Sequence, residues 1–151
     1  MGLGILALME FSGVIAAYLH PRKARPKSGE FGTVFEAGQA DTFPPNSVTP
    51  FIRGKFYLCR LEDGGFLAVS PKCSHLGCTV PWLDKEKEFV CPCHASAFDI
   101  TGEVISPPAP RALDIYRLFL ENNIVKVDTG KRIRRSGFRQ DQVMYAKKAQ
   151  I

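Results

Sequence analysis

Two short segments, each with cysteine and histidine close together, place the strongest restriction on how this chain can fold. Residues 73–78 read CSHLGC and residues 91–96 read CPCHAS. Each segment offers a thiolate and an imidazole within a tight loop, and both groups are metal ligands. Four of the five cysteines of the chain fall between Cys73 and Cys93. The fold must therefore bring two loops together around one four-ligand site.

Two kinds of metal centre use two cysteines and two histidines. Zinc modules usually pair cysteine with cysteine and histidine with histidine, whereas both loops here mix the two residue types. A two-iron cluster with two cysteines on one iron and two histidines on the other needs mixed loops, because each loop then supplies one ligand to each iron. The pattern favours the iron cluster over zinc. A structural module without redox chemistry is a further alternative, and it would show no cluster absorption.

The motif pair C-x-H-x-G-C and C-x-C-H-x-S resembles the cluster-binding signature of Rieske proteins from cytochrome bc-type (quinol:cytochrome c oxidoreductase) complexes. The resemblance implies a Rieske-type [2Fe–2S] cluster as the cofactor. It implies that Cys73 and Cys91 bind the inner iron. It also implies that His75 and His94 bind the outer iron.

The same resemblance assigns roles to residues beside the ligands. It implies a disulfide between Cys78 and Cys93 that joins the two loops, and a hydrogen bond from the Ser96 hydroxyl to a cluster sulfide. Phe98 stands where the family often has a tyrosine, so one hydrogen-bond donor is absent and we expect a lower reduction potential, which suits menaquinol. The alternative is that Phe98 serves only as a core aromatic. Residues 106–111 (SPPAPR) resemble the proline-rich loop that covers the cluster, although proline replaces the usual opening glycine.

The N-terminal segment is long and apolar enough to cross a membrane. Residues 2–19 are apolar except for a few small or polar side chains and Glu10, and as a helix they span about 27 Å. We interpret residues 1–19 as one transmembrane helix in which Glu10 faces a partner helix. A signal peptide, which lacks a basic start here, and a buried soluble helix are the alternatives. Residues 20–31, with proline, glycine and basic side chains, are predicted to be a linker or hinge.

The rest of the chain is rich in short β-type runs separated by turn residues. Residues 56–69 form two such runs around DGG, and residues 113–127 form two more around ENN. We therefore predict an all-β fold, a small antiparallel Rieske-type β-sandwich head over residues 32–130. Its cluster-binding subdomain lies at about residues 71–110. Residues 131–151 are predicted to be a basic tail that is solvated or bound to a partner.

The resemblance implies an electron-transfer subunit that is not catalytic alone. His75 and His94 would face quinol and couple electron transfer to proton transfer. The electron would pass to a c-type cytochrome or an equivalent acceptor, with a cytochrome b subunit as partner, in a respiratory or photosynthetic complex. The alternative is the Rieske small subunit of a molybdenum oxidase of the arsenite oxidase type, which touches no quinol. Soluble Rieske ferredoxins and ring-hydroxylating oxygenases share the ligands but typically lack the disulfide pair.

Charge and the implied disulfide bear on location. The net charge of +5 is concentrated at residues 22–27 and 131–139, and no aromatic side chains interleave the first cluster, so we expect no nucleic-acid partner. Basic residues after the anchor would favour the cytoplasm. A disulfide instead requires an oxidising compartment. We give the cluster motif more weight, because a partner complex can fix the orientation of a single short anchor. We therefore expect a single-pass membrane protein with its head on the periplasmic or equivalent positive side.

Overall fold

A computed structural model describes residues 34–146 of the chain. The predicted transmembrane anchor, residues 1–19, and the predicted linker, residues 20–31, lie outside the described residues. Within residues 34–146, no helix has both the length and the apolar character needed to cross a membrane. The described residues form two antiparallel sheets and two 3₁₀ turns, η1 (Ala40–Thr42) and η2 (Gln140–Gln142).

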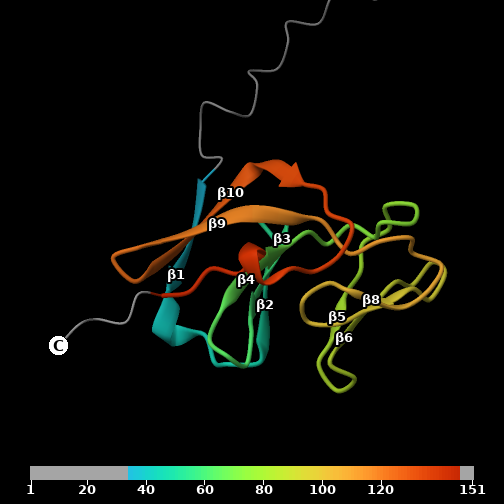
Figure 1. The fold of residues 1–151 in the computed structure, drawn as a ribbon, viewed down its shortest axis with the longest axis horizontal. Helices are drawn as coiled ribbons and strands as arrows, with labels where there is room; N and C mark the ends of the chain where they lie inside the picture. Colours follow the sequence, from blue (N-terminus) through green and yellow to red (C-terminus); the bar gives the residue numbers. More distant parts are fainter. Residues whose placement is uncertain (1–33, 147–151) are drawn as a thin grey trace, which may run out of the picture. The chain divides into compact units, whose positions relative to one another are not determined.

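The larger sheet of the described region contains six strands in the order β1-β10-β9-β4-β3-β2 (Figure 1). Every neighbouring pair in this sheet is antiparallel. The strands are β1 (Val34–Gln39), β2 (Ser47–Phe51), β3 (Phe56–Arg60), β4 (Phe66–Val69), β9 (Ile115–Glu121) and β10 (Ile124–Ile133). Strands distant in the sequence, β4 and β9, lie side by side at its centre, and this pairing closes the head around the segment between them.

That intervening segment forms the smaller sheet, which contains four strands in the order β5-β6-β7-β8 among the described residues. The strands are β5 (Trp82–Leu83), β6 (Glu88–Val90), β7 (Ala97–Phe98) and β8 (Val104–Ser106). All three pairings are antiparallel. The two sheets confirm the predicted all-β fold.

Local sequence explains the hairpins of the larger sheet. Between β9 and β10, Asn122 and Asn123 both have positive φ, +49° and +63°. Two successive left-handed residues make the turn whose twist matches the flanking strands, and asparagine tolerates this conformation. Between β3 and β4, Gly64 has φ +86° and the backbone N–H of Gly65 donates to the Asp63 carboxylate at 3.0 Å. Both predicted turns are therefore present.

Strand β4 is buried on both faces and divides the hydrophobic interior in two. On one face, Phe66 and Ala68 pack into a cluster with side chains of β9 and β10. Leu67 and Val69 point to the opposite face and pack into the other cluster, which includes the buried cysteines of the smaller subdomain. Side chains alternate between the faces of a strand, so an unbroken apolar run can serve both clusters. Residues 70–73 follow directly, so the first ligand loop starts from the most buried strand.

The described part of the C-terminal segment corrects one prediction. The sequence predicts a solvated or partner-bound tail over residues 131–151, but β10 runs to Ile133 and the Arg135 side chain is buried. Met144 and Phe66 exchange two backbone hydrogen bonds, of 2.8 and 3.0 Å. The basic composition predicts a solvated or partner-bound segment, but the Arg135 guanidinium hydrogen-bonds backbone carbonyl groups inside the head instead of water. Up to Ala146 this segment packs as part of the head.

Arg135 is expected to contribute strongly to stability. Its Nε donates to the Leu113 carbonyl at 2.6 Å, its Nη1 to the Gln142 side chain at 2.8 Å, and its Nη2 to the Thr101 carbonyl. Arg135→Met keeps the apolar stem but leaves these acceptors without their donor, so we expect a loss of about 2–4 kcal/mol in the free energy of unfolding. Urea unfolding of the wild type and the variant measures this loss. The neighbouring exposed arginine gives the control: Arg134→Met should cost less than about 0.5 kcal/mol, and equal losses in both variants would contradict the assignment.

Candidate metal centre

The two predicted ligand loops, residues 73–78 and 91–96, adopt the same turn. In each loop the first residue donates its backbone N–H to the last carbonyl, and its own carbonyl accepts the N–H of the fifth residue. The four bonds run from Cys73 to Cys78 (2.8 Å), Gly77 to Cys73 (3.0 Å), Cys91 to Ser96 (2.8 Å) and Ala95 to Cys91 (2.9 Å). The fifth residue has positive φ in both loops, +79° at Gly77 and +58° at Ala95. Each loop thus presents its first cysteine from a closed, hydrogen-bonded ring.

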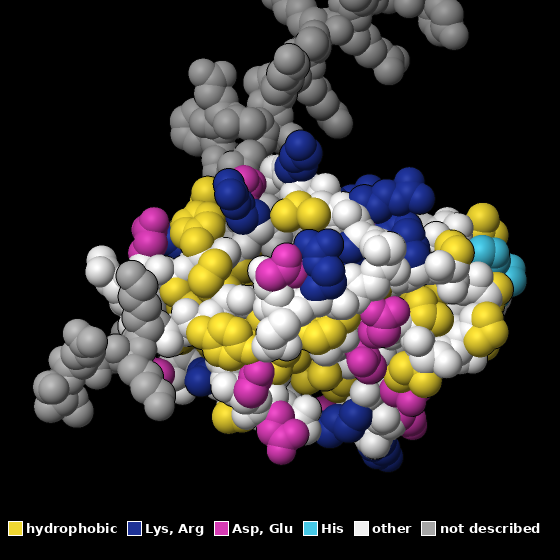
Figure 2. Space-filling view, viewed as in Figure 1, with side chains coloured by type: hydrophobic (Ala, Val, Ile, Leu, Met, Phe, Trp, Pro, Cys, Tyr) yellow, Lys and Arg dark blue, Asp and Glu magenta, His cyan; other side chains and the backbone are white. Residues whose placement is uncertain are grey.

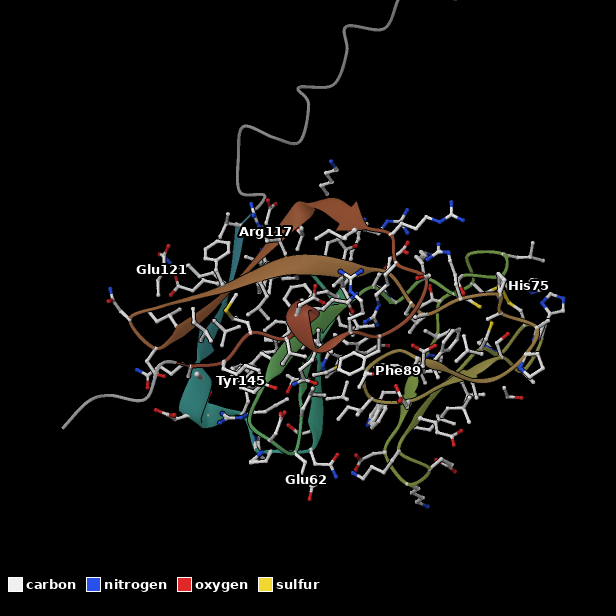
Figure 3. The ribbon with its side chains drawn as sticks, in the orientation of Figure 1. Glu62, His75, Phe89, Arg117, Glu121 and Tyr145 are labelled. Atoms are coloured by element: carbon white, nitrogen blue, oxygen red, sulfur yellow. A yellow bond between two sulfur atoms is a disulfide. The ribbon has the colours of Figure 1, made fainter. Side chains whose placement is uncertain are left out.

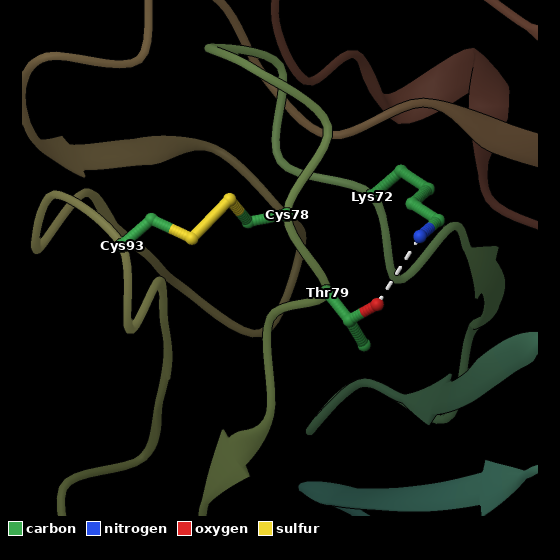
Figure 4. The surroundings of a disulfide bond; sticks show 4 residues. All are labelled: Lys72, Cys78, Thr79 and Cys93. Carbon is green, nitrogen blue, oxygen red and sulfur yellow. Dashed lines mark hydrogen bonds between the residues drawn. A yellow bond between two sulfur atoms is a disulfide. The ribbon is translucent and has the colours of Figure 1, made fainter.

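A disulfide joins the two loops. Cys78 and Cys93 are bonded, with an S–S distance of 2.15 Å and 6.6 Å between their Cα atoms (Figure 4). The bond confirms the pairing that the family resemblance implies. Beside it, the side chains of Lys72 and Thr79 form a hydrogen bond of 3.2 Å next to the first loop. The loops are therefore held together by a covalent link independent of any metal.

The first cysteine of each loop has a buried thiol. Cys73 is 4% exposed and Cys91 is 2% exposed, and neither is in a disulfide. Burial raises the pKa of the Cys73 thiol. Burial also acts to raise the pKa of Cys91, but the backbone N–H groups of Cys93 and His94 point at its sulfur and the net pKa lies below its ordinary value. Amide dipoles aimed at this sulfur favour a thiolate, which is the form that binds a metal.

The two predicted histidine ligands lie together at the end of the head. The centroids of the His75 and His94 rings are 5.0 Å apart and the ring planes are nearly perpendicular, at 82°. His94 is exposed and His75 is half-buried at the tip of the molecule (Figure 3). The Nδ1 atom of His75 is nevertheless buried and has no hydrogen-bond partner among the described residues. Since buried polar atoms are normally paired, this nitrogen fits a metal ligand.

The proline-rich loop, residues 106–111, is tied to both ligand loops. The Ala109 N–H donates to the hydroxyl of Ser96, which is fully buried, at 3.0 Å. The Ser96 hydroxyl also hydrogen-bonds the Cys73 thiol, an interaction that acts to lower the pKa of that thiol. From the first loop, the Ser74 hydroxyl donates to the Arg111 carbonyl at 2.5 Å. Sequence reasoning missed this contact of Ser74, because nothing in the motif indicates which distant carbonyl its hydroxyl meets.

Among the described residues, three cysteine sulfurs lie within 4.8 Å of one another, those of Cys78, Cys91 and Cys93. This set differs from the predicted ligands, because two of its sulfurs are consumed by the disulfide and cannot bind a metal as thiolates. Of the three, Cys91 remains as a donor. Its proximity to the disulfide shows how tightly the second loop is packed against the first.

Two further residues, Phe98 and Cys59, lie in the core. Phe98, in β7, is fully buried in the cluster of side chains that includes Cys73 and Cys91. Cys59, in β3, is also fully buried and belongs to the same core, and burial raises the pKa of its thiol. Cys59 is therefore a buried strand thiol that lies outside both ligand loops.

Comparison with known proteins identifies the arrangement. A family model described as the Rieske [2Fe–2S] domain matches residues 33–117, which include both ligand loops. The chain belongs to the Rieske [2Fe–2S] family. Membership implies a [2Fe–2S] cluster as the cofactor, in agreement with the paired loops and the unpaired His75 nitrogen. The observed donor set fits the cluster.

Several Rieske relatives carry informative names. The cytochrome b6-f complex iron–sulfur subunit of Synechococcus sp. (strain WH7803) is 43% identical over 133 residues, which cover 81% of this chain and 75% of the relative. The subunit of the same name from Chlorobaculum thiosulfatiphilum is 31% identical over 125 residues, covering 82% of this chain and 67% of the relative. A chain of a structure entitled "Hyperthermophilic respiratory Complex III" aligns with a TM-score of 0.50 at 27% identity, covering 83% of this chain and 98% of that chain.

Removing the disulfide of this Rieske head should destabilise it measurably. Cys78 and Cys93 are separated by 15 positions, and a cross-link closing a loop of that length is worth about 3 kcal/mol on a chain-entropy estimate. We expect a reductant to lower the free energy of unfolding of the wild-type chain by about this amount. The Cys78→Ala/Cys93→Ala double variant should start lower and be insensitive to the reductant. Urea unfolding followed by circular dichroism tests this, and a reductant effect of equal size in the double variant would contradict it.

Proposed function

We propose that this chain is the Rieske subunit of a membrane-bound cytochrome b6-f or bc-type complex, where it takes an electron from quinol and passes it to a c-type cytochrome or an equivalent acceptor. The observation that carries the proposal is the placement of two imidazole rings, 5.0 Å apart, at the exposed end of the head, in the same two loops as two buried thiols. The relatives named as cytochrome b6-f iron–sulfur subunits support the type of complex.

The ligand assignment is part of the proposal. Cys73 and Cys91 hold one iron through their sulfurs, and His75 and His94 hold the other. The buried, unpartnered Nδ1 of His75 supports this nitrogen as the donor atom on its ring. The backbone N–H groups that lower the pKa of Cys91 support thiolate ligation there.

The protein's own residues then have distinct tasks. When bound, the cluster supplies one-electron redox chemistry. The histidine rings at the surface offer nitrogen atoms that can bind a quinol oxygen and accept its proton. Ser96 and the proline-rich loop exclude water from the sulfur side, because the Ser96 hydroxyl is fully buried between Cys73 and the Ala109 amide. Proton uptake is thus confined to the histidine side of the centre.

Membrane attachment and partners belong to the same proposal. Residues 1–19 anchor the chain in the membrane, and residues 20–31 let the head move between a cytochrome b subunit and the acceptor. The observed disulfide supports a head on the periplasmic or equivalent positive side, since disulfides persist in oxidising compartments. The names of the relatives favour this role over the small subunit of a molybdenum oxidase.

Electron paramagnetic resonance of reduced membranes tests the ligand set. We expect a Rieske signal with average g below 2 from the wild type and from Cys59→Ala, because Cys59 is a core thiol in β3. Cys91→Ser should abolish it, because serine is a poor substitute for a thiolate ligand of iron. Loss of the signal in Cys59→Ala with retention in Cys91→Ser would overturn the assignment.

The same spectra test the quinol role. Addition of an inhibitor of the bc-type quinol site should shift the wild-type signal, because an occupant of that site contacts a histidine ligand. A signal that is indifferent to the inhibitor would move the assignment to the molybdenum-enzyme relay. Absence of any signal in intact, reduced membranes would overturn the cluster itself.

Phe98 is proposed to keep the reduction potential low, because its ring offers no hydrogen bond to a ligand sulfur. Phe98→Tyr adds a hydroxyl next to the buried cysteines, and one hydrogen bond of about 1 kcal/mol that favours the reduced state raises a one-electron potential by about 40 mV. Redox titration measures the shift. Phe89 is the matched control, because it pairs with Phe98 in the sheet, is equally buried and contacts Tyr57 and Trp82. Equal shifts in Phe98→Tyr and Phe89→Tyr would contradict the proposal.

A further inference from the structure

A concave, basic cleft opens beside the first ligand loop. Its volume is about 440 Å³, and His75 is part of its lining. The walls come from the β2–β3 turn, the first ligand loop and the ends of β9 and β10. It is lined by Lys55, Pro71, Lys72, Cys73, Ser74, His75, Gly77, Arg111, Asp114, Tyr116 and Arg132. We refer to this feature as the basic cleft.

Positive charge dominates the basic cleft. Four cationic side chains, of two lysines and two arginines, line it against the single carboxylate of Asp114. That carboxylate is already paired, closely with Arg111 and at 3.9 Å with Arg132. The two lysines, Lys55 and Lys72, form no ion pair with any described residue. Figure 2 shows a group of Lys and Arg side chains on the upper edge of the head, on the side toward the histidines.

The unpaired lysines have no evident role in holding the fold together. Lys55 is exposed in a turn. Lys72 is exposed just before the first ligand loop, where its ammonium donates a hydrogen bond to the Thr79 hydroxyl. Lys55 also has positive φ, +55°, a conformation that asparagine or glycine adopts more easily. A cationic side chain at these two places therefore adds charge to the cleft, and its contact with the rest of the fold is limited to the exposed hydrogen bond between Lys72 and Thr79.

We propose that the basic cleft receives acidic side chains of the redox protein that exchanges electrons with this chain, and so docks that protein against His75. The inference rests on the proposed function, because it places the partner at the histidine side of the centre. Carboxylates projecting from a partner complement the cations and fit a concavity of this size. Exposed Leu76, 69% accessible, lies next to His75 and supplies an apolar contact beside the charged one. Charged and apolar contacts side by side are typical of short-lived protein interfaces.

An acidic protein suits the basic cleft better than a membrane surface or a nucleic acid. A flat layer of anionic headgroups cannot fill a concavity, and it carries no redox group that could exchange electrons through His75. Single-strand nucleic-acid sites stack successive bases on aromatic side chains, and besides the proposed ligand His75 the described lining offers Tyr116 alone for stacking. Carboxylate side chains on a redox protein can enter the concavity, and the same protein supplies the group that exchanges electrons.

The test compares two double variants of the full chain with the same change in charge. Lys55→Glu/Lys72→Glu replaces two positive charges of the basic cleft with negative ones. Lys85→Glu/Lys87→Glu is the control, because these lysines are exposed in the β5–β6 turn and outside the cleft lining, and Lys87 has φ +57°, close to that of Lys55. Visible and paramagnetic resonance spectra first establish that each variant holds its cluster. A double variant that does not load its cluster is replaced by the matching Lys→Gln double variant, which removes the same positive charges and is judged by the same criteria.

Binding is read by fluorescence anisotropy of a labelled oligo-glutamate peptide at an ionic strength of about 10 mM, where the Debye length is about 30 Å. We expect at least about tenfold weaker binding by Lys55→Glu/Lys72→Glu and little change in the control. If both variants bind the peptide equally weakly, the effect comes from the net charge of the protein and not from the basic cleft, and the inference is overturned. Tighter binding to phosphatidylglycerol vesicles than to the peptide, lost in the same variant, would assign the basic cleft to a membrane surface and overturn it too.

Electron exchange provides an independent readout with two oxidants of opposite charge. The reduced protein gives one electron to hexacyanoferrate(III), forming hexacyanoferrate(II), or to tris(phenanthroline)cobalt(III), forming the cobalt(II) complex. Reversing the charge of the basic cleft should slow electron transfer to the anionic oxidant by about tenfold and speed electron transfer to the cationic one. A change in reduction potential would instead move both rates in the same direction. Parallel changes, or rates that are insensitive to salt, would refute docking at the basic cleft.

Discussion

The covalent link between Cys78 and Cys93 is the constraint on which the geometry of the metal centre depends. The two ligand loops are 12 residues apart between their ends, and each closes its own ring of backbone hydrogen bonds. Such rings fix the shape of each loop but leave the distance between them free. The disulfide fixes that distance, and the buried Ser96 hydroxyl and the proline-rich loop then pack against the joined pair. The folded head itself therefore determines where the ligand side chains lie.

The centre also depends on an unequal distribution of burial. The thiols of Cys73 and Cys91 belong to a hydrophobic cluster that extends through Val69 to strand β4, whereas the histidine rings lie at the end of the head. Iron bound by such a set has one side in the core and the other at the surface. A cluster wholly inside the core would be out of reach of a quinol, and one wholly outside would lose its protection from water. Strand β4, buried on both faces, connects this arrangement to the larger sheet.

Surface charge near the histidines follows from elements that meet only in the folded chain. The basic cleft draws Lys55 from the β2–β3 turn, Lys72 from the first ligand loop, and Arg111 and Arg132 from two later segments. Asp114 neutralises part of the charge through its two arginine partners. The remaining lysine charge is exposed, where it acts at a distance on an approaching anion. The same head thus combines a redox site that is buried on its cysteine side with a basic cleft beside its histidine side.

Much of this protein is determined by its sequence alone. Mixed cysteine and histidine loops predict the family and the cofactor because metal chemistry depends on ligand type and short spacing. Alternating apolar runs and turn residues, such as Asn122 and Asn123, predict the antiparallel hairpins because these interactions are local. The disulfide partner of Cys78 followed from family resemblance, since spacing alone leaves the pairing open.

Other features were decided only by the tertiary structure, because they join residues far apart in the chain. Charge composition predicted a solvated segment after Gly130, yet Arg135 is buried because it meets the carbonyl groups of Leu113 and Thr101. The contact between Ser74 and the Arg111 carbonyl has no sequence signal for the same reason. Long-range hydrogen bonds depend on where distant backbone groups lie after folding, and local patterns carry no record of those positions.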